Sequence, residues 1–262
     1  MELSLIDKTE RYRFEKIERN PDYFHERKEF STVDEIRTLF LHYGSLGINV
    51  ESNGKKNMYA LKAGEGFIFG PNLRYNLSCD SRIFAVQSSS QIAEGKIIEI
   101  LDKGDEKEES ELGPFKLVRN PKRVNKPWGH ELWISWFRDY HVLKQIGMKA
   151  GNMSSLQLHG RKLETNYLVK GEADVIDGYP MDLSLSEDEM KNKIGDVDLS
   201  EYTNRKKAGM HWTSRPGIVH RVISVADYIA YETSTPELDD VIRLSDVSGR
   251  QSGRIDSEHK LS

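Results

Sequence analysis

The chain has 262 residues, of which 37% are hydrophobic and 31% charged, with a formal net charge of -4. This composition is typical of a globular protein long enough for two domains, and the slight acidic excess argues against nucleic-acid binding. No apolar run has the length of a membrane-spanning helix, and the N-terminus lacks the apolar segment of a signal peptide. The single cysteine, Cys79, excludes an intrachain disulfide and suits a reducing compartment. We therefore expect a cytoplasmic protein that binds neither nucleic acid nor membranes.

Short segments with apolar residues at alternate positions follow one another along the chain, separated by Gly, Asn, Asp and Pro. Such segments predict strands with one buried face. Many short strands at near-regular spacing are typical of an all-β sandwich or barrel. The clearest predicted strands are 38–43, 67–70, 83–87, 167–169, 173–176 and 228–232.

The charged run DKGDEKEESE, residues 102–111, contains no apolar side chain and is a predicted linker or exposed turn. The preceding residues, 91–101, are a predicted short helix that closes the first domain. We expect one domain over 1–105, a second over 113–250 and a polar tail over 251–262.

A polar insertion, residues 179–210, interrupts the strand pattern of the second domain. Within it, Glu189 follows Ser186 by three residues, which predicts a capping box at the start of a short helix. Loops of this length are usually functional or mobile, and this one is long enough to cover a site.

The two halves share a faint internal repeat. Tyr75 stands four residues after a proline, as His220 does, and Gly44 ends a predicted strand as Gly171 does. This correspondence predicts two related barrels in tandem.

Four polar side chains of the second half come together if neighbouring strands fold back on one another. Gln157 and His159 are two residues apart, so both project from the same face of a strand. Glu164 opens the next predicted strand after a gap of the length of a tight hairpin loop. His220 precedes another alternating run and can supply a fourth inward side chain.

Residues 151–171 match the first cupin motif, G-x5-[H/Q]-x-H-x4-E-x6-G, and residues 216–224 resemble the second. More specifically, the second half resembles the mannose-6-phosphate isomerase domain that is often fused to mannose-1-phosphate guanylyltransferases. Its motifs are P-W-G at 127–129, S-L-Q-x-H-x4-E at 155–164 and D-D-[IV]-x-R-x-x-D-x-x-G-R at 239–250. The resemblance implies two tandem cupin (jelly-roll) β-barrels, a bicupin, with short peripheral helices.

The resemblance also implies a metal site made by Gln157, His159, Glu164 and His220, called the quartet below. One amide oxygen, two imidazoles and one carboxylate suit a divalent ion, for which zinc is the expected identity. Nickel, manganese and iron(II) stay open, since these ligand types do not separate them.

The activity implied by the resemblance is that of a sugar-phosphate isomerase or epimerase of carbohydrate or nucleotide-sugar precursor metabolism. In this reaction a base moves a proton between C1 and C2 of the sugar. A cationic side chain holds the phosphate and the developing negative charge, and Arg243, Lys144 and Arg250 are the candidates, with Arg243 the first choice. The expected partners are a sugar phosphate or activated sugar and a second copy of the chain, since cupins commonly pair their barrels.

Departures from the family pattern keep other functions open. Gly160, Arg161 and Thr165 stand where family members usually carry histidines, so a related sugar is expected rather than mannose 6-phosphate itself. One alternative is a metal-dependent cupin oxygenase, although Gln157 argues against it because those enzymes more often use a histidine there. The other is a sugar-binding regulatory cupin without catalysis.

The first half keeps the cupin frame but has other residues at the ligand positions. Tyr75 stands where the late histidine falls, and Arg37 stands where the glutamate falls, seven residues before Gly44. Neither Phe30 nor Thr32 can supply the early pair of ligands. We expect a metal-free barrel that serves packing, dimerisation or substrate enclosure.

Overall fold

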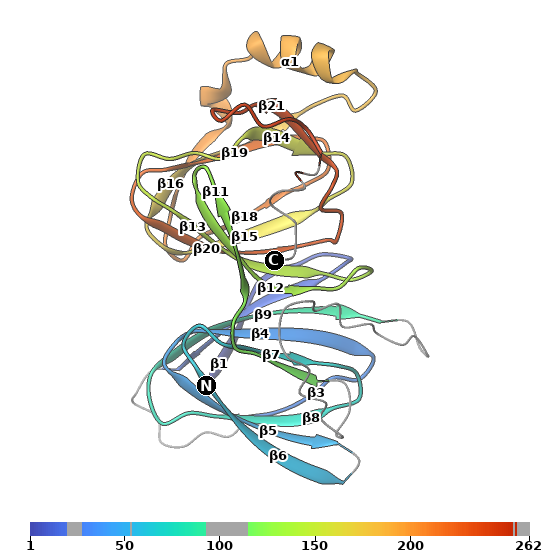
Figure 1. The fold of residues 1–262 in the computed structure, drawn as a ribbon, viewed down its shortest axis with the longest axis vertical. Helices are drawn as coiled ribbons and strands as arrows, with labels where there is room; N and C mark the ends of the chain where they lie inside the picture. Colours follow the sequence, from blue (N-terminus) through green and yellow to red (C-terminus); the bar gives the residue numbers. More distant parts are fainter. Residues whose placement is uncertain (20–27, 53, 93–114, 254, 256–262) are drawn as a thin grey trace. The chain divides into compact units, whose positions relative to one another are not determined.

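The computed structural model describes residues 1–19, 28–52, 54–92, 115–253 and 255, and these form strands with one short α-helix (Figure 1). The chain divides into two compact units. The first barrel is Met1–Lys122 with Ile134–Leu143, and the second barrel is Arg123–Trp133 with Lys144–Ser262. No helix among the described residues is long and apolar enough to cross a membrane.

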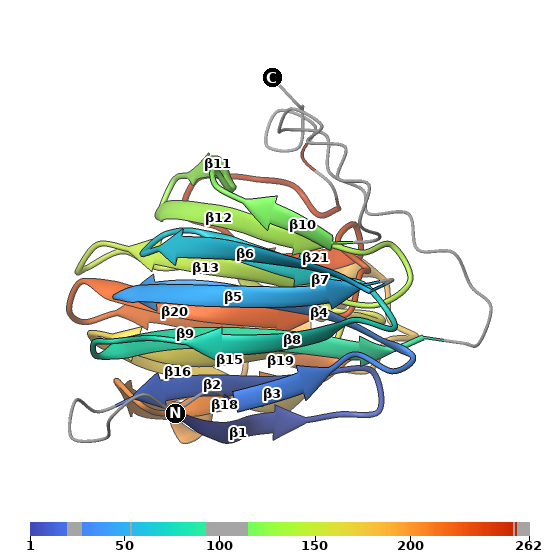
Figure 2. The same ribbon diagram turned by 90° about the horizontal axis from the view of Figure 1, so that it is seen from below.

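The first barrel consists of a six-stranded and a four-stranded antiparallel sheet, whose inward side chains form one apolar core. Figure 2 shows the strands of the smaller sheet side by side. The larger sheet has the order β1 (Glu2–Lys8), β2 (Arg13–Arg19), β9 (Ile83–Gln91), β4 (Glu35–Tyr43), β7 (Gly66–Phe69), β10 (Phe115–Val118). The smaller sheet has the order β3 (Lys28–Ser31), β8 (Arg74–Ser78), β5 (Ser45–Ser52), β6 (Lys55–Lys62).

The second barrel also consists of two antiparallel sheets. One has the order β11 (Lys122–Lys126), β12 (Gly129–Trp136), β13 (Val142–Met148), β20 (Tyr228–Ser234), β15 (Glu164–Lys170), β18 (His211–Ser214). The other has the order β17 (Thr203–Lys207), β16 (Glu172–Pro180), β19 (Ile218–Ser224), β14 (Leu156–His159), β21 (Val241–Ser245). The tip of the β12–β13 hairpin is part of the first barrel, where Phe137 packs on Ile36 and Ile68.

The strand orders confirm the predicted tandem repeat. The run β9-β4-β7 corresponds to β20-β15-β18, and β6-β5-β8-β3 corresponds to β17-β16-β19-β14. Gly44 and Gly171 follow the equivalent strands β4 and β15, with φ of 92° and 93°. A Cβ atom on either would lie 2.4 Å from the Arg82 carbonyl oxygen or 2.2 Å from that of Asp227. Only glycine fits both the backbone angle and this close approach, so the two barrels share this turn as well as their strand order.

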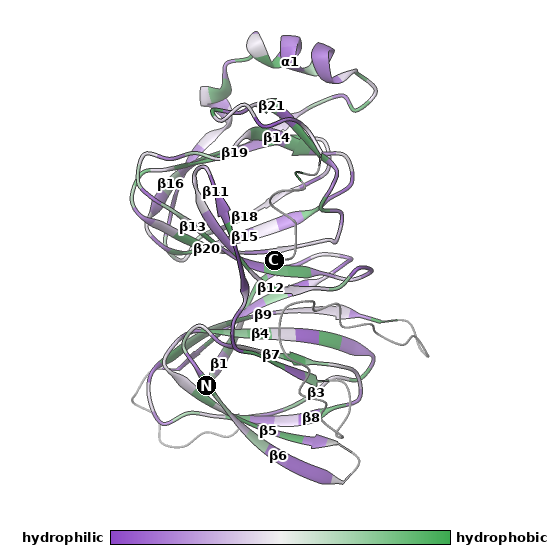
Figure 3. Ribbon diagram, viewed as in Figure 1, coloured by the Kyte–Doolittle hydropathy of each residue, from purple (hydrophilic) through white to green (hydrophobic). Residues whose placement is uncertain are grey.

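Five of the six clearest predicted strands lie within observed strands, and the sixth, 67–70, extends one residue past β7. Hydrophobic and hydrophilic stretches lie within the same strands in both barrels (Figure 3). The domain boundary differs from the prediction, because residues 115–118, expected in the second domain, pair with β7 of the first barrel. The predicted helix over 91–101 falls largely outside the described residues, and Gln91 itself ends strand β9; the linker at 102–111 lies wholly outside them.

The insertion at 179–210 contains the helix α1 (Glu187–Gly195), a 3-10 turn (Leu199–Tyr202) and the edge strand β17. The predicted capping box is confirmed: Ser186 accepts from the Glu189 backbone N–H, and the Glu189 carboxylate accepts from the Ser186 N–H. The apolar side of α1, Met190 and Ile194, packs on apolar side chains of β14 and β21. Figure 1 shows the helix beside these two strands. The helix therefore braces the outer face of this sheet, and no residue of the insertion lines the cavity described below.

Candidate metal centre

Strand periodicity gives β14 one polar and one apolar face. Gln157 and His159 point into the second barrel, while Leu156 and Leu158 point outward and pack in the cluster under α1. Gln157 pairs with His220 of β19 across the sheet. Antiparallel pairing therefore places three side chains of the quartet on one inward-facing surface.

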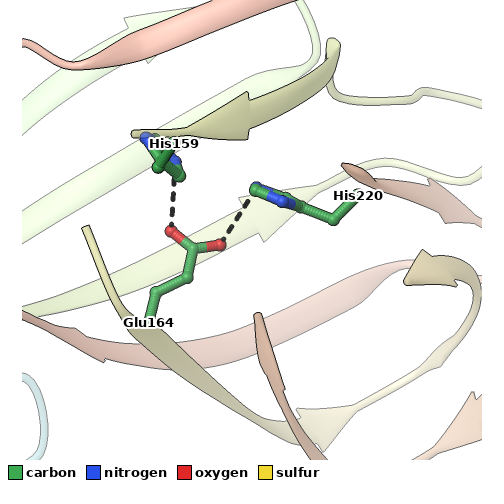
Figure 4. A group of neighbouring side chains, drawn as sticks. All are labelled: His159, Glu164 and His220. Carbon is green, nitrogen blue, oxygen red and sulfur yellow. Dashed lines mark ion pairs between the residues drawn. The ribbon is translucent and has the colours of Figure 1, made fainter. Parts of the chain in front are cut away.

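Glu164 of β15 completes this group from the opposite sheet. Its carboxylate oxygens lie 3.7 Å from His159 Nε2 and 3.5 Å from His220 Nε2 (Figure 4). The ligand atoms of these three buried residues lie within 4.8 Å of one another. The Gln157 side-chain amide, which is half-buried, lies 3.4 Å from His220 Nε2. The predicted convergence of the quartet is thus observed.

Hydrogen bonds orient both imidazoles toward Glu164. His159 Nδ1 lies 3.1 Å from Asp240 Oδ1, and His220 Nδ1 lies 3.0 Å from the Ile218 carbonyl oxygen. The tautomer with the proton on Nδ1 suits both acceptors, and it leaves the Nε2 lone pairs directed inward. Asp240 is itself held, because its second oxygen accepts from the backbone N–H groups of Arg161 and Lys162.

The donor set fits a divalent metal ion. His159 Nε2 is buried without a hydrogen-bond partner, which is costly for a polar atom unless something binds it. Burial lowers the pKa of His220, so its neutral form, the form that binds metals, is favoured. Burial raises the pKa of Glu164, but Lys162 and the two histidines lower it further, and the group is a carboxylate at neutral pH. Two neutral imidazoles, one carboxylate and one amide are suitable ligands for such an ion.

A chain of alternating charges extends from the quartet into the barrel. Lys162 Nζ lies 2.5 Å from Glu164 Oε2 and 2.9 Å from Glu232 Oε1. Lys144 Nζ lies 3.9 Å from Glu232 and 3.6 Å from Glu131, over the ring of Trp133. All these charged side chains are at most 12% exposed, so each charge is stabilised mainly by its neighbours.

Sequence reasoning missed three members of this chain, Lys162, Glu232 and Glu131. Lys162 stands two residues before Glu164, a spacing that places both on one face if the strand starts early. Glu232 lies on β20, whose alternation predicted a strand but gave no sign of which residues it would face. Pairing of β20 with β15 decides that contact.

The predicted cationic residues Arg243, Lys144 and Arg250 all line one cavity of about 120 Å³ together with the quartet. Arg243 on β21 donates to the carbonyl oxygens of Gln251 and Gly253. Arg250 donates to Asp246 Oδ2 at 2.7 Å and to Ser155 Oγ at 3.1 Å, which closes the loop of the D-x-x-G-R motif. Trp128, Ile146 and Met148 form an apolar part of the same wall. The cavity thus joins the candidate ligands to both cationic and apolar groups.

The first barrel has different contacts at the positions equivalent to the quartet. Phe30 pairs with Tyr75 across the sheet as Gln157 pairs with His220. Arg37 Nη1 lies 2.5 Å from Tyr75 Oη, and its guanidinium lies 5.9 Å from the Phe30 ring centre. The Arg37 guanidinium and the two aromatic rings therefore stand where the second barrel has the Glu164 carboxylate and its neighbours.

No protein-family model and no curated protein matches this chain. Among solved structures it is similar to Lactobacillus farciminis oxalate decarboxylase in complex with formate, with a TM-score of 0.61 and 13% identity over 90% of this chain and 80% of that one. Bacillus subtilis oxalate decarboxylase, a protein with Mn(II) centres, gives a TM-score of 0.60 and 12% identity over 90% and 72%. At such identity the likeness shows the bicupin fold alone. The resemblance to mannose-6-phosphate isomerases rests on the sequence motifs.

Proposed function

We propose that the second barrel is a divalent-metal-dependent enzyme that acts on a small, oxygen-rich anion. The observation that carries the proposal is the partnerless Nε2 of buried His159, which faces the Glu164 carboxylate beside His220. The quartet would hold the ion, and the ion, when bound, would polarise substrate oxygens. Only the ligand types support zinc as this ion. Manganese has equal support, because a structurally similar protein has Mn(II) centres.

The residues beside the quartet suit acid–base chemistry. Glu232 is a buried carboxylate that lines the cavity and can exchange a proton with a bound molecule. Lys162 bridges Glu232 and Glu164, so it holds both carboxylates in place. Arg243, on the same cavity wall, is the proposed contact for the anionic group of the substrate.

Oxygenase or lyase chemistry on a small carboxylate is the reaction class that the structural comparisons favour. The similar solved structures are oxalate decarboxylases, one of them in complex with formate. The cationic groups around the cavity agree with a carboxylate substrate.

Sugar-phosphate isomerisation or epimerisation is the second candidate. It is favoured by the buried Glu232, since transfer of a proton between neighbouring carbons requires a positioned base. Three sequence motifs of the second half support the same reaction. A sugar-binding regulatory cupin would share the cavity but show no turnover.

Elemental analysis of the purified protein, paired with two assays, tests the proposal. One assay measures oxygen uptake and CO2 release from small carboxylates, and the other measures isomerisation of hexose and pentose phosphates. We expect about one metal ion per chain and turnover in one assay. Metal without turnover would support the regulatory function instead, and absence of metal would overturn the proposal.

Variants test the ligand assignment directly. We expect His159→Ala combined with His220→Ala to abolish metal retention after chelation and reloading, because two of the four ligands are lost. His211→Ala is the matched control, since His211 is exposed on β18 and does not line the cavity. Full metal content in the double variant would show that the ion binds elsewhere.

A further inference from the structure

Tyr228 places a hydroxyl group in the cavity wall without giving it a partner. The residue opens β20, is 1% exposed and lines the same cavity as the quartet. Its ring packs in an apolar cluster with Trp128, Met148 and Leu168. Its hydroxyl oxygen is buried and makes no hydrogen bond. A phenylalanine would fill the same space without leaving a polar atom unsatisfied, so the hydroxyl has no packing role.

A second tyrosine on the same strand has a hydroxyl group with a hydrogen-bond partner inside the protein. Tyr231 is also buried, but it projects from the opposite face, three residues along the strand. Its hydroxyl accepts a hydrogen bond from Gln145 Nε2 at 2.7 Å. The two tyrosines differ in that only the one lining the cavity has an unsatisfied hydroxyl.

The surroundings of the Tyr228 hydroxyl favour an uncharged oxygen as its partner. Glu232 lies four residues along β20 on the same face and lines the cavity with Glu164. Burial, together with these two carboxylates, holds the pKa of Tyr228 well above its usual range, so the phenol stays protonated and can donate. Glu232 and Glu164 are the charges that act on this phenol, and they disfavour a further negative charge beside it.

We propose that the Tyr228 hydroxyl donates a hydrogen bond to an uncharged oxygen, a hydroxyl or carbonyl group, of the molecule bound in the cavity. The residue thereby selects hydroxylated ligands over ligands whose oxygens all belong to carboxylates. The inference rests on the proposed function, because the quartet is taken to bind the remaining oxygens of the same molecule.

The first test compares Tyr228→Phe with Tyr231→Phe in thermal unfolding without ligand. We expect an unchanged or higher midpoint for Tyr228→Phe, because a hydroxyl without a partner is removed. Tyr231→Phe loses the bond from Gln145 and is expected to unfold at a lower temperature. Equal losses in both variants would mean that the Tyr228 hydroxyl has a structural partner, and the inference would fail.

The second test measures binding of glycolate, oxalate and mannose 6-phosphate to the metal-loaded protein by calorimetry. Glycolate and oxalate have two carbons each, but glycolate carries a hydroxyl group where oxalate carries a second carboxylate. We expect Tyr228→Phe to bind glycolate and mannose 6-phosphate about two- to tenfold more weakly than the wild type, the effect of one hydrogen bond, and oxalate equally well. Tyr231→Phe should leave all three affinities unchanged.

Several results would overturn the inference. One is an equal loss of oxalate and glycolate binding in Tyr228→Phe, and another is metal-loaded wild type that binds neither glycolate nor mannose 6-phosphate. Metal content, measured on every sample, separates this failure from that of the proposed function. A protein without metal contradicts the proposed function, whereas a metal-loaded protein with unchanged glycolate binding in Tyr228→Phe contradicts the role of the tyrosine alone.

Discussion

Arg37 of the first barrel and Glu164 of the second lie on equivalent strands, each seven residues before the glycine that follows the strand. Tyr75 and His220 are equivalent in the same way, each paired with the residue opposite, Phe30 or Gln157. In the second barrel these positions bring two imidazoles to a carboxylate. In the first they bring a guanidinium to a phenol and an aromatic ring.

This difference shows that the barrel fold and the candidate metal site depend on separate residues. Both barrels keep the glycine turn and the strand order, which depend on backbone angles and on alternating apolar side chains. Exchange of the inward polar residues leaves that frame intact but replaces the candidate metal ligands with a permanent cation. Arg37 contacts Glu35 and Tyr75, so its charge is neutralised within the protein. The four predictions below test this separation.

The largest effect is expected from metal binding itself. Mn²⁺ or Zn²⁺ at about 1,000 times its dissociation constant should stabilise the second barrel by about 4 kcal/mol, because only the folded form holds the ion. Scanning calorimetry with and without the ion measures this shift. The unfolding temperature of the first barrel should not change when the ion is added. A metal-dependent rise for both barrels would contradict the separation of barrel and site.

Arg37→Leu should destabilise the first barrel by about 3 kcal/mol, since it removes the buried cation that Glu35 and Tyr75 contact. Urea unfolding measures the loss, and the metal content of the protein should stay the same. Lys56→Leu is the matched control, because Lys56 also pairs with a glutamate of the first barrel, but its side chain is 78% exposed and that of Glu51 46%. We expect the control to cost less than about 1 kcal/mol. Equal costs would show that burial does not matter at Arg37.

Asp240→Asn should weaken metal binding by about ten- to a hundredfold, because Asp240 orients His159 and its second oxygen accepts two backbone N–H groups. An amide cannot accept at both positions. Competition with a metal-sensitive dye measures the affinity. Asp239→Asn, at the exposed neighbouring residue, serves as the control and should bind metal like the wild type. Wild-type metal affinity in Asp240→Asn would show that orientation of His159 by Asp240 does not affect metal binding.

Near pH 6 the smallest effect, below about 1 kcal/mol, concerns the first barrel, and it grows on further acidification. His141 is fully buried, with Nδ1 2.9 Å from Ser90 Oγ, and burial lowers its pKa to about 3 from 6.5. Between these two pH values the unfolded chain binds a proton that the folded chain does not. The contribution of His141 is therefore fully present above pH 6.5 and falls as the pH drops toward 3, by up to about 1.4 kcal/mol per unit.

Unfolding of wild type and His141→Gln between pH 4 and 7.5 isolates this contribution, since all other titrating groups are shared. The variant should show a shallower loss of stability on acidification. His211→Gln, at an exposed histidine, should follow the wild type. Parallel curves for wild type and His141→Gln would mean that His141 does not titrate in this range.

Local patterns in the sequence were enough to predict much of the fold and the candidate ligands. Alternation of apolar residues predicted the strands, and the resemblance to the cupin motifs implied the quartet. The capping box at Ser186 was likewise predicted from residues three apart. The strands and the capping box depend on neighbouring residues and on the regular geometry of one element, whereas the quartet joins three strands.

The tertiary structure alone decided which distant residues meet. It places Glu232 beside Lys162, Asp240 beside His159 and α1 against the outer face of the ligand sheet rather than over the cavity. It also leaves the Tyr228 hydroxyl without a partner. These contacts join residues far apart in the chain, and they are set by strand pairing and core packing, which no local period of the sequence encodes.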